Sequence, residues 1–129
     1  RPSSKLEVFY TGGPARLSRD GALIACAAGE DVKVVEVATG AVTRTFPGDG
    51  EPITALAVSP DGKTLVAASR STAVRVLSLE SGEVVRTWRP HKSPVADLAV
   101  DASGGYLATA SADRSVKVWD LAGGRRRRQ

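Results

Sequence analysis

Short runs of alternating apolar and polar residues fill most of the chain, and turn-forming segments separate them. The run 53–58, for example, reads Ile-Thr-Ala-Leu-Ala-Val and is followed by Ser-Pro-Asp-Gly. Alternation with a period of two is typical of half-buried β-strands, and Pro-Asp-Gly is a turn signal. The pattern predicts strands at about 15–18, 22–28, 32–38, 41–46, 53–58, 64–69, 73–79, 83–88, 95–100, 106–111 and 115–121.

The same order of strands and turns repeats along the chain. The segment 53–62 returns as 95–104, with apolar positions falling on apolar positions, after an interval of 42 residues. The segment 39–46 precedes 81–88 by the same interval. A unit of ~40–45 residues with four short antiparallel strands is typical of a β-propeller blade. The repeat therefore predicts three blade units, at about 15–46, 53–88 and 95–121.

The chain resembles the WD-repeat family over nearly its full length. The resemblance depends on the repeat length, the predicted strands within each repeat and the dipeptide Trp119-Asp120 in the third copy. The resemblance implies an all-β fold, a WD-repeat β-propeller fragment of about three four-stranded antiparallel blades. Closed propellers have ~4–8 blades, so we expect a ring that is not closed.

Both ends of the chain are expected to differ from the three copies. The third copy runs from Leu121 into Ala-Gly-Gly and four arginines, so we expect its fourth strand to be missing and residues 122–129 to form a disordered basic tail. The run 5–10 is strand-like and belongs to none of the copies. In closed propellers such a strand often completes the last blade. We expect residues 1–121 to be a partial propeller whose missing blades follow Gln129 in a longer protein.

Composition and charge favour a folded protein with a neutral body. Hydrophobic residues make up 42% and charged residues 25% of the 129 residues, close to the globular average. The net charge of +4 is that of the four arginines at 125–128. Cys26 is the only cysteine, so no intrachain disulfide can form. No apolar stretch approaches the ~18–20 residues that span a bilayer, and the first residues lack the apolar core of a signal peptide. We expect an intracellular, soluble protein.

Four residues of the third copy are expected to form a structural hydrogen-bond network. In similar WD-repeat blades, a His before the first strand, a Ser or Thr on the second, an Asp in the next turn and a Trp on the third are linked. The alternative is a Ser-His-Asp catalytic triad. Here the Asp lies two residues after the Ser, in a tight turn between paired strands, which favours the structural network. The expected members are His91, Ser111, Asp113 and Trp119, with Trp119 buried.

The first two copies lack this network, so we expect those blades to rely on apolar packing. The second copy has Asp49, Ser69, Ser71 and Leu77 at the matching positions.

One His and one Cys cannot supply the usual zinc ligands, and no Gly-Lys-Ser/Thr phosphate loop is present. We therefore expect no catalytic residue, no metal, no cofactor and no small-molecule substrate. A terminal arginine run is more often solvated than bound to nucleic acid phosphates.

Several segments resemble, in order, the N-terminal propeller of the transducin-beta-like WD-repeat proteins of the small-subunit processome. The resemblance implies a non-catalytic scaffold in the nucleus, at the nucleolus, within a ribonucleoprotein assembly that processes pre-ribosomal RNA. Its partners would be other proteins of the complex, with RNA touched at most peripherally and no membrane contact. The likeness ends before 123–129. A general WD-repeat adaptor, such as a ubiquitin-ligase substrate receptor, is the alternative. The matching segments are 9–13, 34–40, 53–56, 68–70 and 91–95.

Overall fold

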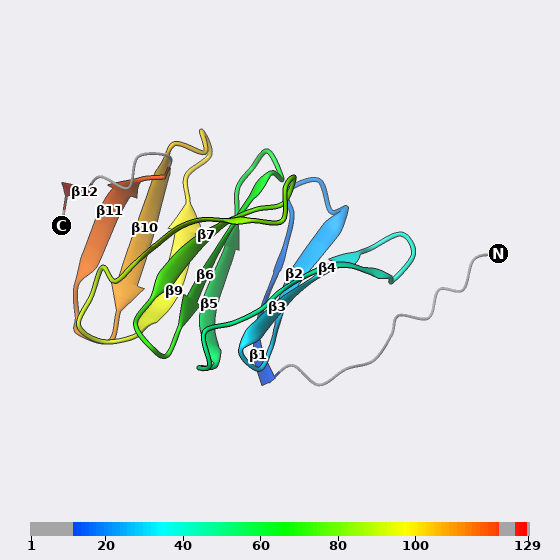
Figure 1. Ribbon diagram of the computed structural model, residues 1–129. Coiled ribbons are helices and arrows are strands. Elements are labelled where there is room, and N and C mark those ends of the chain that lie inside the picture. The colour runs from blue at the N-terminus through cyan, green and yellow to red at the C-terminus, as the bar shows by residue number, and fades with distance from the viewer. Residues whose placement is uncertain (1–11, 122–125, 129) are drawn as a thin grey trace.

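Three four-stranded antiparallel sheets make up the fold. The computed structural model describes residues 12–121 and 126–128, and in Figure 1 the three sheets stand side by side without closing a ring. The first sheet contains β1 (Gly12–Leu17), β2 (Leu23–Ala28), β3 (Asp31–Glu36) and β4 (Val42–Phe46). The second contains β5 (Ile53–Val58), β6 (Thr64–Ser69), β7 (Val74–Ser78) and β8 (Val84–Trp88). The third contains β9 (Val95–Val100), β10 (Tyr106–Ser111), β11 (Val116–Asp120) and β12 (Arg126–Arg128). The prediction of an all-β fold with about three four-stranded units and an open ring is confirmed.

The second sheet is buried on both faces because it lies between the other two. Leu56, Leu65 and Leu77 pack against Val32 and Phe46 of the first sheet. The side chains at the alternate positions point to the opposite face of the sheet. Those from β6 and β7 pack against the third sheet. This two-sided burial explains the continuous apolar runs 55–58 in β5 and 65–68 in β6. The residues of this second layer are Val66, Val74 and Val76 against Val95, Leu98 and Leu107.

The first strands of the three sheets lie next to one another. β5 contacts both β1 and β9. Arg16 of β1 reaches the third sheet, where its Nη2 lies 3.3 Å from Oδ1 of Asp97. The strands β1, β5 and β9 therefore form the inner edge of the arc, and the later strands of each sheet lie further out.

The 42-residue interval in the sequence corresponds to a repeated turn geometry. The β6–β7 and β10–β11 turns both contain a residue other than glycine with positive φ, Thr72 at 77° and Arg114 at 74°. Matching backbone bonds close the two turns, from Ser69 N–H to the Ala73 carbonyl and from Ser111 N–H to the Ser115 carbonyl. Positive φ is uncommon for such residues. Its recurrence shows that the repeat extends to the backbone of the turns.

The prediction that the third sheet lacks its fourth strand is wrong. Arg126 to Arg128 form the short strand β12, which pairs antiparallel with β11 and opposes Arg128 to Val118. The free edge of β11 offers unpaired backbone N–H and C=O groups. Another extended segment can hydrogen-bond to these groups through its own backbone, so its side chains need not be apolar. The tail is therefore a strand at 126–128. The rest of the tail, and the run 5–10 expected to complete the last blade, lie outside the described residues.

Within the part of the chain that the structure describes, no helix is long and apolar enough to cross a membrane.

Candidate functional site

A polar network lies at one end of the third sheet, where three segments meet. His91 comes from the connection between β8 and β9, and Asp113 comes from the turn between β10 and β11. Thr109 and Trp119 come from β10 and β11 themselves. The side chains of His91 and Thr109 are buried, at 5% and 0% exposure. Polar groups removed from water to this extent need partners.

The hydrogen bonds of this network run in one continuous chain. Trp119 Nε1 donates to the hydroxyl oxygen of Thr109 at 3.1 Å, and that hydroxyl lies 2.7 Å from His91 Nε2. The other ring nitrogen, His91 Nδ1, lies 3.1 Å from Asp113 Oδ2 and 2.9 Å from Ser115 Oγ. A proton on Nδ1 donates toward the carboxylate, and Nε2 then accepts from Thr109. In this arrangement each side chain of the network, from Trp119 to Asp113, has a hydrogen-bond partner.

The expectation that Ser111 lies between His91 and Trp119 is corrected by the register of the sheet. Leu107 pairs with Trp119 across β10 and β11. Thr109 is the next residue after Leu107 on the same face of β10, and Ser111 is the one after that, further along the strand from Trp119. Thr109 is therefore the hydroxyl within reach of the indole. The Ser111 hydroxyl donates instead to the carbonyls of Ser93 and Pro94, at 3.0 and 3.1 Å.

Trp119 was expected to be buried, and it is half-buried. Its indole meets that of Trp88 from β8 edge to face, with ring centroids 5.6 Å apart and planes inclined by 70°. The Arg86 guanidinium lies 4.4 Å from the centroid of the Trp88 ring and donates to the Leu121 carbonyl at 3.0 Å. Trp119 is thus covered by the second sheet on one side, and it links the network to the contact between the two sheets.

The environment of Asp113 keeps its carboxylate ionised. The hydroxyl and the backbone N–H of Ser115, together with the His91 ring, hydrogen-bond the carboxylate and lower the pKa of Asp113 to about 2 against the opposing effect of burial. A charged acceptor holds the imidazole more firmly than a neutral one. The network therefore fastens the β8–β9 connection to the β10–β11 turn.

The order Asp113, His91, Thr109 is also that of a catalytic triad, but its geometry is that of an orienting network. The Thr109 hydroxyl has no exposed surface, and it is already bonded to the Trp119 indole. A nucleophile must reach its substrate. In this place the hydroxyl holds neighbouring segments together.

A second polar network, missed in the sequence, lies at the same end of the second sheet. The Ser69 hydroxyl donates to Asp49 Oδ2 at 2.7 Å and lies 2.6 Å from the Ser71 hydroxyl, which also donates to Asp49. Burial raises the pKa of Asp49, but the bonds from Ser71 and Ser69 and the charge of Arg75 outweigh it and lower the pKa. Asp49 stands 42 residues before His91. The expectation that this blade relies on apolar packing alone is therefore corrected.

No group of three or more His, Cys, Asp or Glu side chains among the described residues is arranged to hold a metal ion.

Known families match most of the chain. Residues 82–120 match the family described as "WD domain, G-beta repeat". Residues 18–100 match the family described as "Anaphase-promoting complex subunit 4 WD40 domain".

Curated relatives match about half of the chain. Transducin beta-like protein 3 of Homo sapiens is 46% identical over 63 residues, and the protein of the same name from Bos taurus is 44% identical over 63 residues. Each alignment covers 48% of this chain and 8% of the relative. The matched stretch is therefore a small part of those proteins.

A solved structure has the same arrangement of strands. The crystal structure of the Myceliophteria thermophila Cps50 (Swd1) β-propeller domain aligns with a TM-score of 0.79 at 23% sequence identity. The alignment covers 91% of this chain and 39% of that one. At this level of identity the likeness concerns the fold alone.

Proposed function

We propose, from the premise that the chain belongs to the WD40-repeat family, that it is a scaffold for protein–protein contacts in a ribonucleoprotein assembly. WD40 propellers are generally non-catalytic and typically bind other proteins. The assembly we propose is the nucleolar small-subunit processome, and the process is the maturation of pre-ribosomal RNA. The partners are other proteins of the complex, and the site of action is the nucleolus.

The observation that carries this proposal is the similarity to transducin beta-like protein 3. The identity of 46% over 63 residues is high for two WD-repeat segments that share only a fold, as the 23% identity to the solved propeller domain illustrates. The aligned stretch of 63 residues covers 48% of this chain, which is more than one blade unit of ~40–45 residues. Fold alone does not determine function, so the proposal depends on these residues and not on the propeller.

The second candidate is a WD-repeat adaptor of another complex, such as a ubiquitin-ligase substrate receptor. The observation that favours it is the match of residues 18–100 to a family described after a subunit of the anaphase-promoting complex. Both candidates are interaction scaffolds, so they differ in partners and in location.

Depletion of the protein in cells tests the proposal. We expect pre-ribosomal RNA of the small subunit to accumulate unprocessed, and a fluorescently tagged copy to concentrate in the nucleolus. Re-expression of the depleted protein should restore processing, which controls for indirect effects. Normal processing after depletion, or a cytoplasmic location at steady state, would contradict the proposal and favour the adaptor.

A further inference from the structure

A basic pocket lies beside the His91 network at the end of the third sheet. Its volume is about 520 Å³, within the range of ~300–1,000 Å³ that is usual for small-ligand sites. The β8–β9 connection lines one side of the pocket, and the β10–β11 turn with the start of β11 lines the other. The lining residues are Arg89, Pro90, His91, Lys92, Asp113, Ser115 and Lys117.

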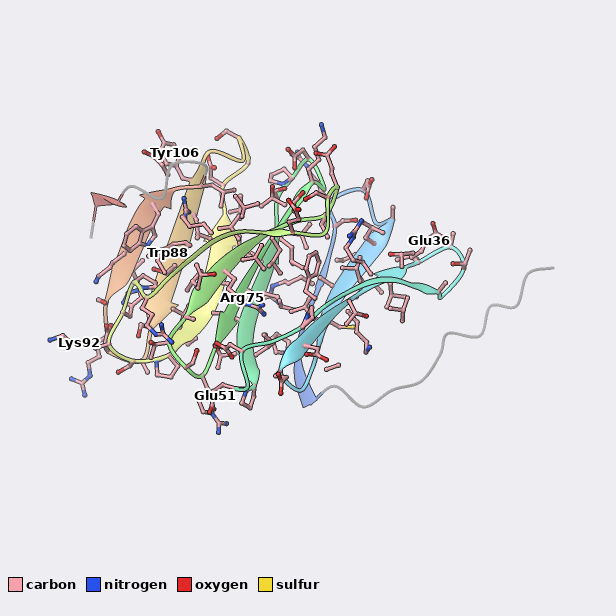
Figure 2. The ribbon with its side chains drawn as sticks, viewed as in Figure 1. Glu36, Glu51, Arg75, Trp88, Lys92 and Tyr106 are labelled. Carbon is pink, nitrogen blue, oxygen red and sulfur yellow. The ribbon has the colours of Figure 1, made fainter. Side chains whose placement is uncertain are left out.

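Three cations line this pocket against one carboxylate. Arg89 and Lys92 are exposed, and Figure 2 shows Lys92 directed away from the sheet into solvent. Lys117 is half-buried and is held in place by the Pro90 carbonyl, to which its Nζ donates at 2.7 Å. Within the described residues none of the three forms an ion pair. Asp113 is already hydrogen-bonded to Ser115 and His91, so the pocket presents a net positive charge.

The matching positions of the second sheet do not form such a pocket lining. Pro47 and Gly50 stand 42 residues before Arg89 and Lys92. The remaining cation there, Arg75, is buried and donates to the Pro47 carbonyl at 2.7 Å. The cluster of exposed cations is therefore a property of the third blade and not of the repeat.

The residues around the pocket favour a peptide over RNA. Proteins that bind single-stranded RNA usually stack its bases on aromatic side chains. The exposed aromatic ring among the described residues is Tyr106, and Figure 2 places it at the opposite end of the third sheet from Lys92. The pocket offers instead the buried His91 at its base and the exposed cationic side chains of Arg89 and Lys92 at its rim. Such a site suits an anionic side chain of a peptide, which the cations can bind by charge-assisted hydrogen bonds.

We propose that the pocket bounded by Arg89, Lys92 and Lys117 binds an acidic peptide segment of a partner protein, through a phosphorylated or carboxylate side chain. This inference deepens the proposed scaffold function, on which it rests, by naming a contact site and the chemistry of the partner. Rim cations of this kind contribute mainly electrostatic attraction, so binding should weaken as salt is added.

The test uses fluorescence anisotropy with the full chain and three labelled probes. The probes are a short peptide with phosphoserine among glutamates, the same peptide with unmodified serine, and a single-stranded oligouridylate. The pocket variant carries Arg89→Glu and Lys92→Glu. The matched control carries Arg19→Glu and Lys63→Glu, which change the net charge equally on exposed cations in the β1–β2 and β5–β6 turns. Circular dichroism and thermal melting establish that both variants are folded.

We expect the pocket variant to bind the acidic peptide about tenfold more weakly than the unchanged chain, and the control variant to bind it as the unchanged chain does. Comparison of the two peptides identifies phosphate or carboxylate as the preferred anion. Equal weakening in both variants, or no binding of either peptide, would overturn the proposal. Tighter, pocket-dependent binding of the oligouridylate would replace it with an RNA site. These outcomes concern the purified chain, so they are independent of whether depletion affects RNA processing.

Discussion

Thr109 is the residue on which the third-sheet network depends most. Its hydroxyl is the one group that bonds both the His91 ring and the Trp119 indole, and it is fully buried. Loss of this hydroxyl would leave a ring nitrogen and an indole N–H without a partner. Removal of one partner of a buried polar group costs more free energy than the bond itself contributes, because the remaining group stays desolvated.

Replacement of Thr109 by Val should therefore lower the free energy of unfolding by about 1–3 kcal/mol. Val keeps the shape and the β-propensity of Thr, so the change isolates the hydroxyl. The measurement is urea unfolding followed by tryptophan fluorescence, which also reports on Trp119. Thr45→Val in β4, at an exposed position, is the control and should change stability by less than about 0.5 kcal/mol. Equal stability of the two variants would show that the network does not stabilise the blade.

Asp113 should make stability depend on pH in acid. Its pKa is lowered from 3.8 to about 2 in the folded chain. A group whose pKa is lower when folded stabilises the protein above its unfolded pKa, and that contribution is lost as the pH falls from about 4 toward 2. Asp113→Asn, which cannot titrate, should therefore show a smaller fall in Tm over this interval than the unchanged chain.

The control for this effect is Glu83→Gln, which removes an exposed carboxylate near the start of β8. We expect this variant to lose stability in acid as the unchanged chain does. If Asp113→Asn and the unchanged chain lose the same amount of Tm between pH 4 and pH 2, the hydrogen bonds to the carboxylate are not maintained in solution.

At the scale of elements, β12 shows how a strand can form without an alternating pattern. Its three arginines pair with β11 through the backbone. An unpaired strand edge is a template for any extended segment that reaches it. The pairing leaves β11 as an internal strand, like β7 in the second sheet.

Truncation after Leu121 should therefore expose the edge of β11. We expect hydrogen exchange in peptides that cover 116–121 to become faster, while exchange in 64–78 stays unchanged, because backbone amides exchange when their bonds open. Replacement of the arginines at 126–128 by glutamine is the control, since it keeps the backbone and removes the charge. Unchanged exchange after truncation would mean that β12 does not protect β11.

The sequence predicts the strands well and the side-chain partners less well. The alternation and the 42-residue interval are local properties, so strands such as β6 and β10 fall close to their predicted positions. The choice between Thr109 and Ser111 depends on the register of β10 against β11, which no local pattern reveals. The Asp49 network was missed because Asp49 stands at the position of His91 and Ser71 at that of Asp113, so the residue types of the third-copy network are not repeated.

At the scale of the whole molecule, three sheets share two apolar layers and one inner edge. Each layer is built from both neighbouring sheets, so no sheet folds around a core of its own. The polar networks of the second and third sheets both lie at the end where β6 meets β7 and β10 meets β11. At this end the turns are held by hydrogen bonds and the basic pocket lies beside them. We expect partners to contact this end of the molecule.

Affinity purification of the full-length protein from cells tests the central claim most directly. The captured proteins and RNA are identified from two samples, one of which is treated with ribonuclease before capture. We predict that proteins of the small-subunit processome are recovered and that they remain after ribonuclease treatment, because the scaffold is held by protein contacts. Recovery of ubiquitin-ligase subunits without processome proteins, or loss of the processome proteins after ribonuclease treatment, would contradict the account.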